Sequence, residues 1–99
     1  MSTAAKAARG AYAGYKGVDW RFSKGMRKYM VKYKGFGMHV FLRSGLAGSE
    51  FVVWHNKGTP SYELKRGFKK TECGSMLAAI AFVDSGKAAE VLKQMRAKR

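Results

Sequence analysis

Apolar and polar residues alternate along the middle of the chain, between residues 28 and 69. Residues 28–34 carry aromatic or β-branched side chains at every second position, with lysines at most of the positions between them. A period of two is typical of a β-strand that turns one face to a core and the other to solvent. The same alternation recurs at residues 38–43 and 61–69, and residues 50–55 are rich in Val, Phe and Trp, which favour strands. The sequence therefore predicts four strands.

The segments between these strands have the composition of turns. Gly35 and Gly37 flank Phe36 and predict a hairpin turn there, residues 44–49 are rich in glycine and serine, and residues 56–60 combine asparagine, glycine and proline. Consecutive strands joined by short turns usually pair with each other. The sequence therefore predicts a four-stranded antiparallel meander.

After residue 70 the apolar positions change to helical spacing. Ser75 is a plausible N-cap, and the basic end from Lys93 onward suits a helix C-terminus. Ser85 and Gly86 interrupt the run without changing its phase, so a kinked helix and two short helices both fit. One stripe holds Leu77, Ile80, Ala81, Ala88, Val91, Leu92 and Met95.

These elements predict an α+β domain in which the C-terminal helical segment packs on one face of the sheet and leaves the other face open. A chain of 99 residues fits one domain, which we place at residues 18–99. Residues 1–17 contain six Ala, three Gly and three basic residues without a sustained apolar period. They predict a flexible basic arm, or a segment that is ordered only against a partner.

Charge sets this chain apart from an average domain. Twenty Lys and Arg oppose six Asp and Glu, which gives a net charge of +14. Residues 1–34 hold nine of the basic residues against Asp19 alone. Because self-repulsion of this size destabilises a compact chain, the charge predicts a polyanionic partner such as RNA or DNA.

The predicted strands assign a candidate binding surface to the face away from the helix. Phe41 would stack on unpaired bases, and so would Trp54 if Phe51 and Val53 point inward. The open alternatives are a solvated face, rings covered by another subunit, or Trp54 in the core. The cations expected to capture phosphates are Arg21, Lys24, Arg27, Lys28, Lys32, Lys34, Arg43, Lys65 and Lys69.

The stretch before the first predicted strand also mixes aromatic and basic residues. Tyr15, Trp20, Phe22 and Tyr29 alternate there with five lysines and arginines. They either contact nucleic acid directly, or Trp20 and Phe22 attach the N-terminal arm to the domain core.

Catalytic chemistry finds little support in the sequence. His39 and His55 have no Cys, Asp or Glu at a spacing that would complete a metal site, and Cys73 stands alone. The six carboxylates are scattered, and no serine has the partners of a nucleophile. We therefore expect a protein that is not an enzyme and that has no metal and no cofactor.

A single cysteine allows no internal disulfide, which favours a reducing compartment such as the cytosol, the nucleus or an organelle matrix or stroma. The opening residues lack the apolar run of a secretory signal, although their composition loosely suits an organellar transit peptide. No apolar run is long enough to cross a membrane. We expect a small RNA- or DNA-binding protein of low sequence specificity, alone or in a ribonucleoprotein particle. The alternative is a structural accessory subunit of a large organellar or viral complex, whose charge meets acidic subunits or anionic lipid.

Overall fold

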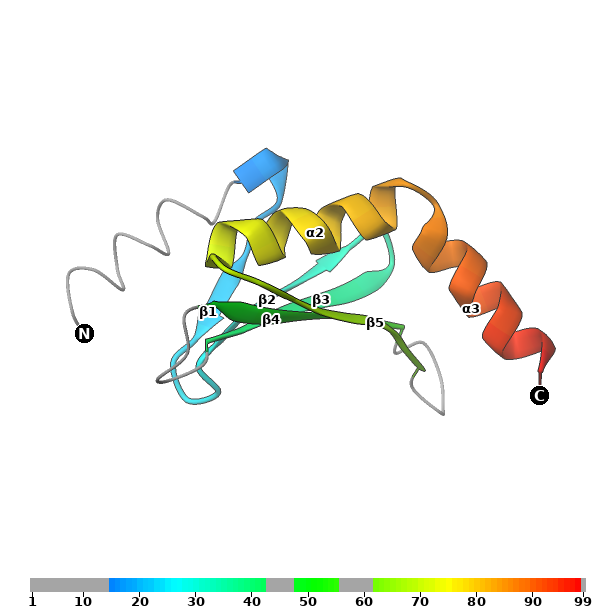
Figure 1. Ribbon diagram of the computed structural model, residues 1–99, viewed down its shortest axis with the longest axis horizontal. Helices are drawn as coiled ribbons and strands as arrows, with labels where there is room; N and C mark the ends of the chain where they lie inside the picture. Colours follow the sequence, from blue (N-terminus) through cyan, green and yellow to red (C-terminus); the bar gives the residue numbers. More distant parts are fainter. Residues whose placement is uncertain (1–14, 43–47, 56–61, 99) are drawn as a thin grey trace.

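The computed structural model describes residues 15–42, 48–55 and 62–98, and these residues form an α+β fold (Figure 1). A short 3-10 turn, η1 (Tyr15–Gly17), precedes five antiparallel strands in one open sheet of order β1-β2-β3-β4-β5. The strands are β1 (Arg21–Ser23), β2 (Lys28–Tyr33), β3 (Phe36–Leu42), β4 (Ser49–His55) and β5 (Tyr62–Lys69), followed by the helices α2 (Glu72–Asp84) and α3 (Lys87–Ala97). The α+β class and the meander order are confirmed, whereas the prediction of four strands is wrong. Residues 1–14 of the predicted arm lie outside the described residues.

The additional strand, β1, ties the segment before β2 to the core. Phe22 pairs with Tyr29 on β2, and the centroids of the two rings lie 4.9 Å apart. Trp20, only 1% exposed, and Val18 belong to the hydrophobic core. Of the two roles considered for Trp20 and Phe22, attachment to the core is the one that the structure shows.

A two-residue turn joins β2 to β3. Lys34 and Gly35 both have positive φ angles, of 51° and 87°. Two such residues in succession match the twist of a tight hairpin, and glycine is favoured there. The turn therefore ends before Phe36. Phe36 and Gly37, which were predicted to lie in the turn, belong to β3.

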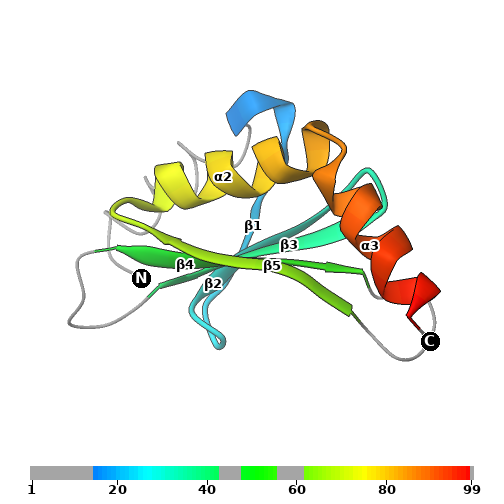
Figure 2. The same cartoon turned by 45° about the vertical axis from the view of Figure 1, so that its right-hand side comes forward.

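Both helices lie on the same side of the sheet (Figure 2). Helix α2 packs on β3, β4 and β5, and α3 contacts α2 and β5. The core between α2 and the sheet contains Met38, Val40, Phe51, Val53, Met76, Ala79, Ile80 and Val83. In α2 the predicted stripe is right at Ile80 and wrong at Ala81, which is exposed. In α3 it includes Ala88 and Leu92, the two buried residues of that helix.

Two polar residues define the start of α2. Thr71 is the N-cap, and its Oγ1 accepts a hydrogen bond from the Gly74 amide at 2.9 Å. Ser75, the predicted cap, is instead fully buried and donates from Oγ to the Ser49 carbonyl oxygen at 2.7 Å. At the other end Gly86, with a φ of 85°, ends the helical conformation and divides the segment into α2 and α3.

The pairing of β4 with β5 contains a bulge that decides which way the β5 side chains point. Val53 pairs with Lys65 and Trp54 with Glu63, so Leu64 is an extra residue. Beyond the bulge Lys65 and Lys69 pair with inward-facing residues of β4 and share the helix side of the sheet. The prediction that Lys65 and Lys69 lie on the face opposite the helix is therefore wrong.

Candidate nucleic-acid interface

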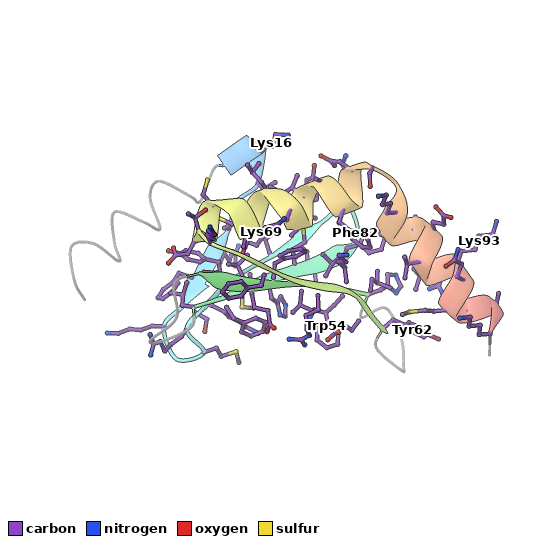
Figure 3. All side chains as sticks on the ribbon, viewed as in Figure 1. Lys16, Trp54, Tyr62, Lys69, Phe82 and Lys93 are labelled. Atoms are coloured by element: carbon purple, nitrogen blue, oxygen red, sulfur yellow. The ribbon has the colours of Figure 1, made fainter. Side chains whose placement is uncertain are left out.

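We use the name open face for the side of the sheet that α2 and α3 leave uncovered. In Figure 3 Trp54 lies on this side, whereas Phe82 and Lys69 lie on the side of α2. The pairing registers assign to it Arg21, Ser23, Lys28, Met30, Lys32, Gly37, His39, Phe41, Glu50, Val52, Trp54, Glu63, Arg66 and Phe68.

Lys28 is the central cation of this face. It pairs with Phe41 across β2 and β3, and its Nζ lies 5.3 Å from the centroid of the Phe41 ring. The same Nζ lies 3.3 Å from Nδ1 of His39. One ammonium group thus makes a cation–π contact with one ring and a hydrogen-bond contact with the other.

His39 links two larger aromatic rings into a row. Its ring centroid lies 6.0 Å from that of Phe41 and 6.4 Å from that of Trp54. Burial, and secondly the charge of Lys28, lower the pKa of His39 below its ordinary value of 6.5. The imidazole is therefore neutral at pH 7, and its Nδ1 is free to accept from Lys28. The row Phe41, His39 and Trp54 is an uncharged aromatic strip at the centre of the open face.

A hollow of about 700 Å³ adjoins this strip over β1, β2 and β3. Gly37 contributes to it because it faces Trp54 without a side chain of its own. The exposed cations Arg21 and Lys32 line the hollow, and neither forms an ion pair within the described parts of the chain. The complete lining is Asp19, Arg21, Met30, Val31, Lys32, Gly37 and His39.

The β4–β5 side of the open face is electrically different. Arg66 lies 2.6 Å from Glu50 through one terminal nitrogen and 2.6 Å from Glu63 through the other. The hydrogen bond from Arg66 lowers the pKa of Glu63. Unpaired positive charge on this face consequently lies on β1 and β2, while β5 adds Phe68, which is 51% exposed.

The structure brings together five of the predicted site residues on the open face. These are Arg21, Lys28, Lys32, Phe41 and Trp54. Trp54 is only partly buried, although its Nε1 is enclosed and has no hydrogen-bond partner within the described ranges.

The other predicted site residues lie elsewhere. Lys24 and Arg27 are exposed in the turn between β1 and β2. Lys34 lies in the β2–β3 turn, where its Nζ donates to Asp84 at 2.8 Å, so it is engaged in an ion pair at the end of α2. Lys65 and Lys69 line the helix side, and Arg43 falls outside the described residues.

Sequence reasoning missed several open-face residues, among them Arg66, Phe68 and Met30. Alternation counted from Tyr62 and Leu64 assigns Arg66 to the same face as those two residues, because the bulge at Leu64 is not visible in the residue pattern. Met30 stands between two basic positions of β2, and its place beside the hollow follows only from the position of the short strand β1.

Comparison with known proteins gives no further guide to the site. No family model, curated protein or solved structure matches this chain. Its residues alone carry the functional interpretation.

The two histidines lie on opposite sides of the sheet. His39 is on the open face, whereas His55 is buried on the helix side, with its ring 5.7 Å from that of Phe36. Within the described ranges no three His, Cys, Asp or Glu side chains are grouped as metal ligands. No helix in those ranges is both long and apolar enough to span a membrane.

Proposed function

We propose that this chain binds nucleic acid through the open face, as a non-catalytic protein of low sequence specificity. The observation that supports this most strongly is the arrangement of Arg21, Lys28 and Lys32 beside the aromatic row on a face that no helix covers. Cations bind a phosphate backbone, and aromatic rings bind bases by stacking. The net charge of +14 supplies long-range attraction to the same partner.

In this proposal the two kinds of contact act together. Arg21 and Lys32 hold phosphates at the hollow, while bases stack on Phe41 and on the accessible part of Trp54. Lys28 leaves the face of the Phe41 ring and turns to a phosphate when a base arrives. Stacking on a side chain requires unpaired bases, so we expect single-stranded RNA or DNA to bind more tightly than a duplex. Few side chains here are suited to reading base edges, and discrimination between sequences is weak.

A salt titration tests the proposal. Binding of a fluorescent single-stranded oligonucleotide is measured by anisotropy over a range of salt concentrations, for the wild type and for Lys28→Glu/Lys32→Glu. Each phosphate contact on a single strand contributes about 0.7 to the slope of log K against log salt, so the double variant lowers the slope by about 1.4 or more. Lys93→Glu/Lys98→Glu, on α3 and at its C-cap, changes the net charge equally and is the matched control. Equal losses in the two double variants would show that the open face is not the site.

A second candidate function is that of an accessory subunit in a larger protein assembly. It draws support from two exposed apolar side chains of the open face, Met30 at 37% and Phe68 at 51%. Arg66, on the β5 side of this face, is neutralised by Glu50 and Glu63. Such a surface suits a protein partner as well as a base. Affinity purification from cells after nuclease treatment separates the two functions. Protein partners that remain bound favour the accessory subunit, and their release by nuclease favours nucleic-acid binding.

A further inference from the structure

A second, separate groove lies on the helix side of the sheet, between β5 and the helices. It has a volume of about 370 Å³ and is lined by Phe51, Lys65, Lys69, Ala78, Ala81, Phe82, Ser85 and Lys87. Figure 3 shows Lys69 and Phe82 on this side, away from Trp54. The groove is therefore distinct from the open face and from the nucleic-acid site proposed above.

The groove combines an apolar floor with a cationic rim. Phe51, Phe82 and two alanines of α2 supply the floor, and exposed Lys65, Lys69 and Lys87 surround it. No acidic side chain lines it, and none of the three lysines takes part in an ion pair among the described residues. Three of the chain's six acids, Glu50, Glu63 and Asp84, are paired with other cations. A ligand for this groove must bring its own negative charge together with an apolar group.

The outer edge of β5, the strand beside the groove, pairs with no other strand in the described ranges. β5 is the last strand of the sheet and pairs with β4 on one side only among the described residues. Helix α3 lies near the Tyr62 end of β5, which leaves the stretch from Lys65 to Lys69 at the margin of the sheet (Figure 2). An edge strand presents backbone N–H and C=O groups that an extended peptide can pair with.

We propose that this edge of β5 binds an extended acidic peptide as an additional strand. Peptide side chains on the helix side lie next to Lys65 and Lys69. Carboxylates there meet the lysine rim, and an apolar side chain enters toward Phe82. Backbone hydrogen bonds with β5 hold the peptide in register.

The backbone and the charge together select this partner over others. Nucleic acid can bind the lysines, but its backbone has no N–H donors to pair with a strand edge. A second copy of this chain carries a net charge of +14 and is repelled by the same lysines that attract an acidic strand. Lysines on the edge thus exclude self-association while they admit an anionic strand.

The first test uses a short fluorescent peptide whose every second residue is in turn glutamate, leucine and glutamate, with threonine between them, so that the carboxylates and the leucine lie on one face of the added strand. It is measured with the full chain at physiological salt. Lys65→Glu/Lys69→Glu weakens binding of this peptide about tenfold or more, because attraction at the rim becomes repulsion. Lys28→Glu/Lys32→Glu makes the same change in net charge on the open face and leaves peptide binding within about twofold of the wild type, since screening is strong beyond about 8 Å. Equal effects of the two double variants would overturn the proposal.

The second test asks whether the peptide adds as a strand. Two versions are N-methylated at every second residue, in the two alternate phases. The version whose methyl groups face β5 binds about tenfold more weakly, while the other binds like the parent peptide. Amide hydrogen exchange of Lys65 to Lys69 slows when the parent peptide is bound. Equal binding of both methylated peptides, or unchanged exchange in β5, would overturn strand addition.

The same variants keep this proposal separate from the nucleic-acid proposal. Lys65→Glu/Lys69→Glu retains oligonucleotide binding close to that of the control variant Lys93→Glu/Lys98→Glu if the two sites are independent. If an unlabelled single-stranded oligonucleotide displaces the peptide, and the groove variant loses both ligands, the groove is a nucleic-acid contact and the peptide proposal is wrong. If the wild type binds the acidic peptide but no oligonucleotide, the nucleic-acid proposal fails and the peptide proposal stands.

Discussion

The ammonium group of Lys28 lies 5.3 Å from the centre of the Phe41 ring, directly across the β2–β3 pair. The pair joins the flank of unpaired cations on β1 and β2 to the aromatic row on β3 and β4. In the proposed complex, a base stacked on Phe41 would replace the cation–π contact and free Lys28 for a phosphate. The cost of the lost contact, about 0.5–1 kcal/mol at an exposed site, is smaller than the gain from a stacked base.

Replacing the two members of this pair separately distinguishes stacking from charge. Phe41→Leu removes the ring and weakens single-stranded oligonucleotide binding by about 1–3 kcal/mol, with little change in the salt slope. Lys28→Gln lowers the slope by about 0.7 and keeps the ring. Phe68→Leu, on the same face but at the β5 edge, is the control and retains wild-type affinity. Anisotropy titrations at several salt concentrations measure all three, and a loss for Phe68→Leu equal to that for Phe41→Leu would contradict a specific role for Phe41.

We expect His39 to make oligonucleotide binding sensitive to pH. Burial and Lys28 hold its pKa below 6.5, so charging His39 costs free energy in the free protein. Phosphates near the aromatic row favour the charged imidazole and raise this pKa. By linkage, oligonucleotide affinity increases as the pH falls from the pKa of His39 in the complex to its lowered pKa in the free protein.

NMR titration of the His39 ring, free and with oligonucleotide, checks this prediction. Lys28→Gln raises the pKa of free His39 only part of the way to 6.5, because burial is the larger cause. His39→Gln removes the dependence of affinity on pH in this range. An unchanged pH dependence in His39→Gln would show that another group is responsible.

The parts of the fold that sequence patterns predicted are the ones built from long regular segments. Tyr29, Val31 and Tyr33 alternate far enough to reveal β2, and the long apolar run of α2 identifies a helix. Strand β1 has only three residues, too few for a period to show. Its existence depends on tertiary pairing of Phe22 with Tyr29, which no local pattern encodes.

The candidate site shows the same limit more sharply. Lys28, Lys32 and Phe41 occupy strands of simple register, and their shared face was predicted. Lys65 and Lys69 follow the bulge at Leu64, and one inserted residue reverses the face of every position after it. Lys34 alternates with Tyr33 in sequence, but its positive φ places it in the turn, where Asp84 binds it.

Asp84 connects the β2–β3 turn to the end of α2. Because its carboxylate must be ionised to make this connection, the free energy of unfolding depends on pH. Its Oδ1 accepts from Lys34 Nζ and from Tyr33 Oη, each at 2.8 Å. These hydrogen bonds, chiefly the one from Lys34, lower the pKa of Asp84 from its ordinary value of 3.8. The stabilisation is therefore complete above 3.8 and is lost as the pH falls through the lowered pKa.

Asp84→Asn is expected to lower the Tm at neutral pH and to approach the wild-type Tm in strong acid. Glu90→Gln on α3, outside any described ion pair, is the control and follows the wild type throughout. Thermal unfolding by circular dichroism over a series of pH values measures the difference. If the difference in Tm between Asp84→Asn and the wild type stayed constant into strong acid, this would contradict the role given to the carboxylate.

Gly67 permits the close packing of Phe51 beneath β5. A Cβ added at Gly67 would lie 2.5 Å from two atoms of the Phe51 ring, which is itself buried between the sheet and α2. Gly67→Ala therefore forces the ring or the strand to move, and we expect a loss of about 1–3 kcal/mol in the free energy of unfolding. Gly25→Ala is the matched control, because its Cβ would meet nothing within 4 Å in the β1–β2 turn. Denaturant unfolding compares the free energies of unfolding of the two variants. Equal stability of the two variants would mean that Phe51 has room to move that the structure does not show. Because Phe51 also forms the groove floor, Gly67→Ala should in addition reduce binding of the acidic peptide.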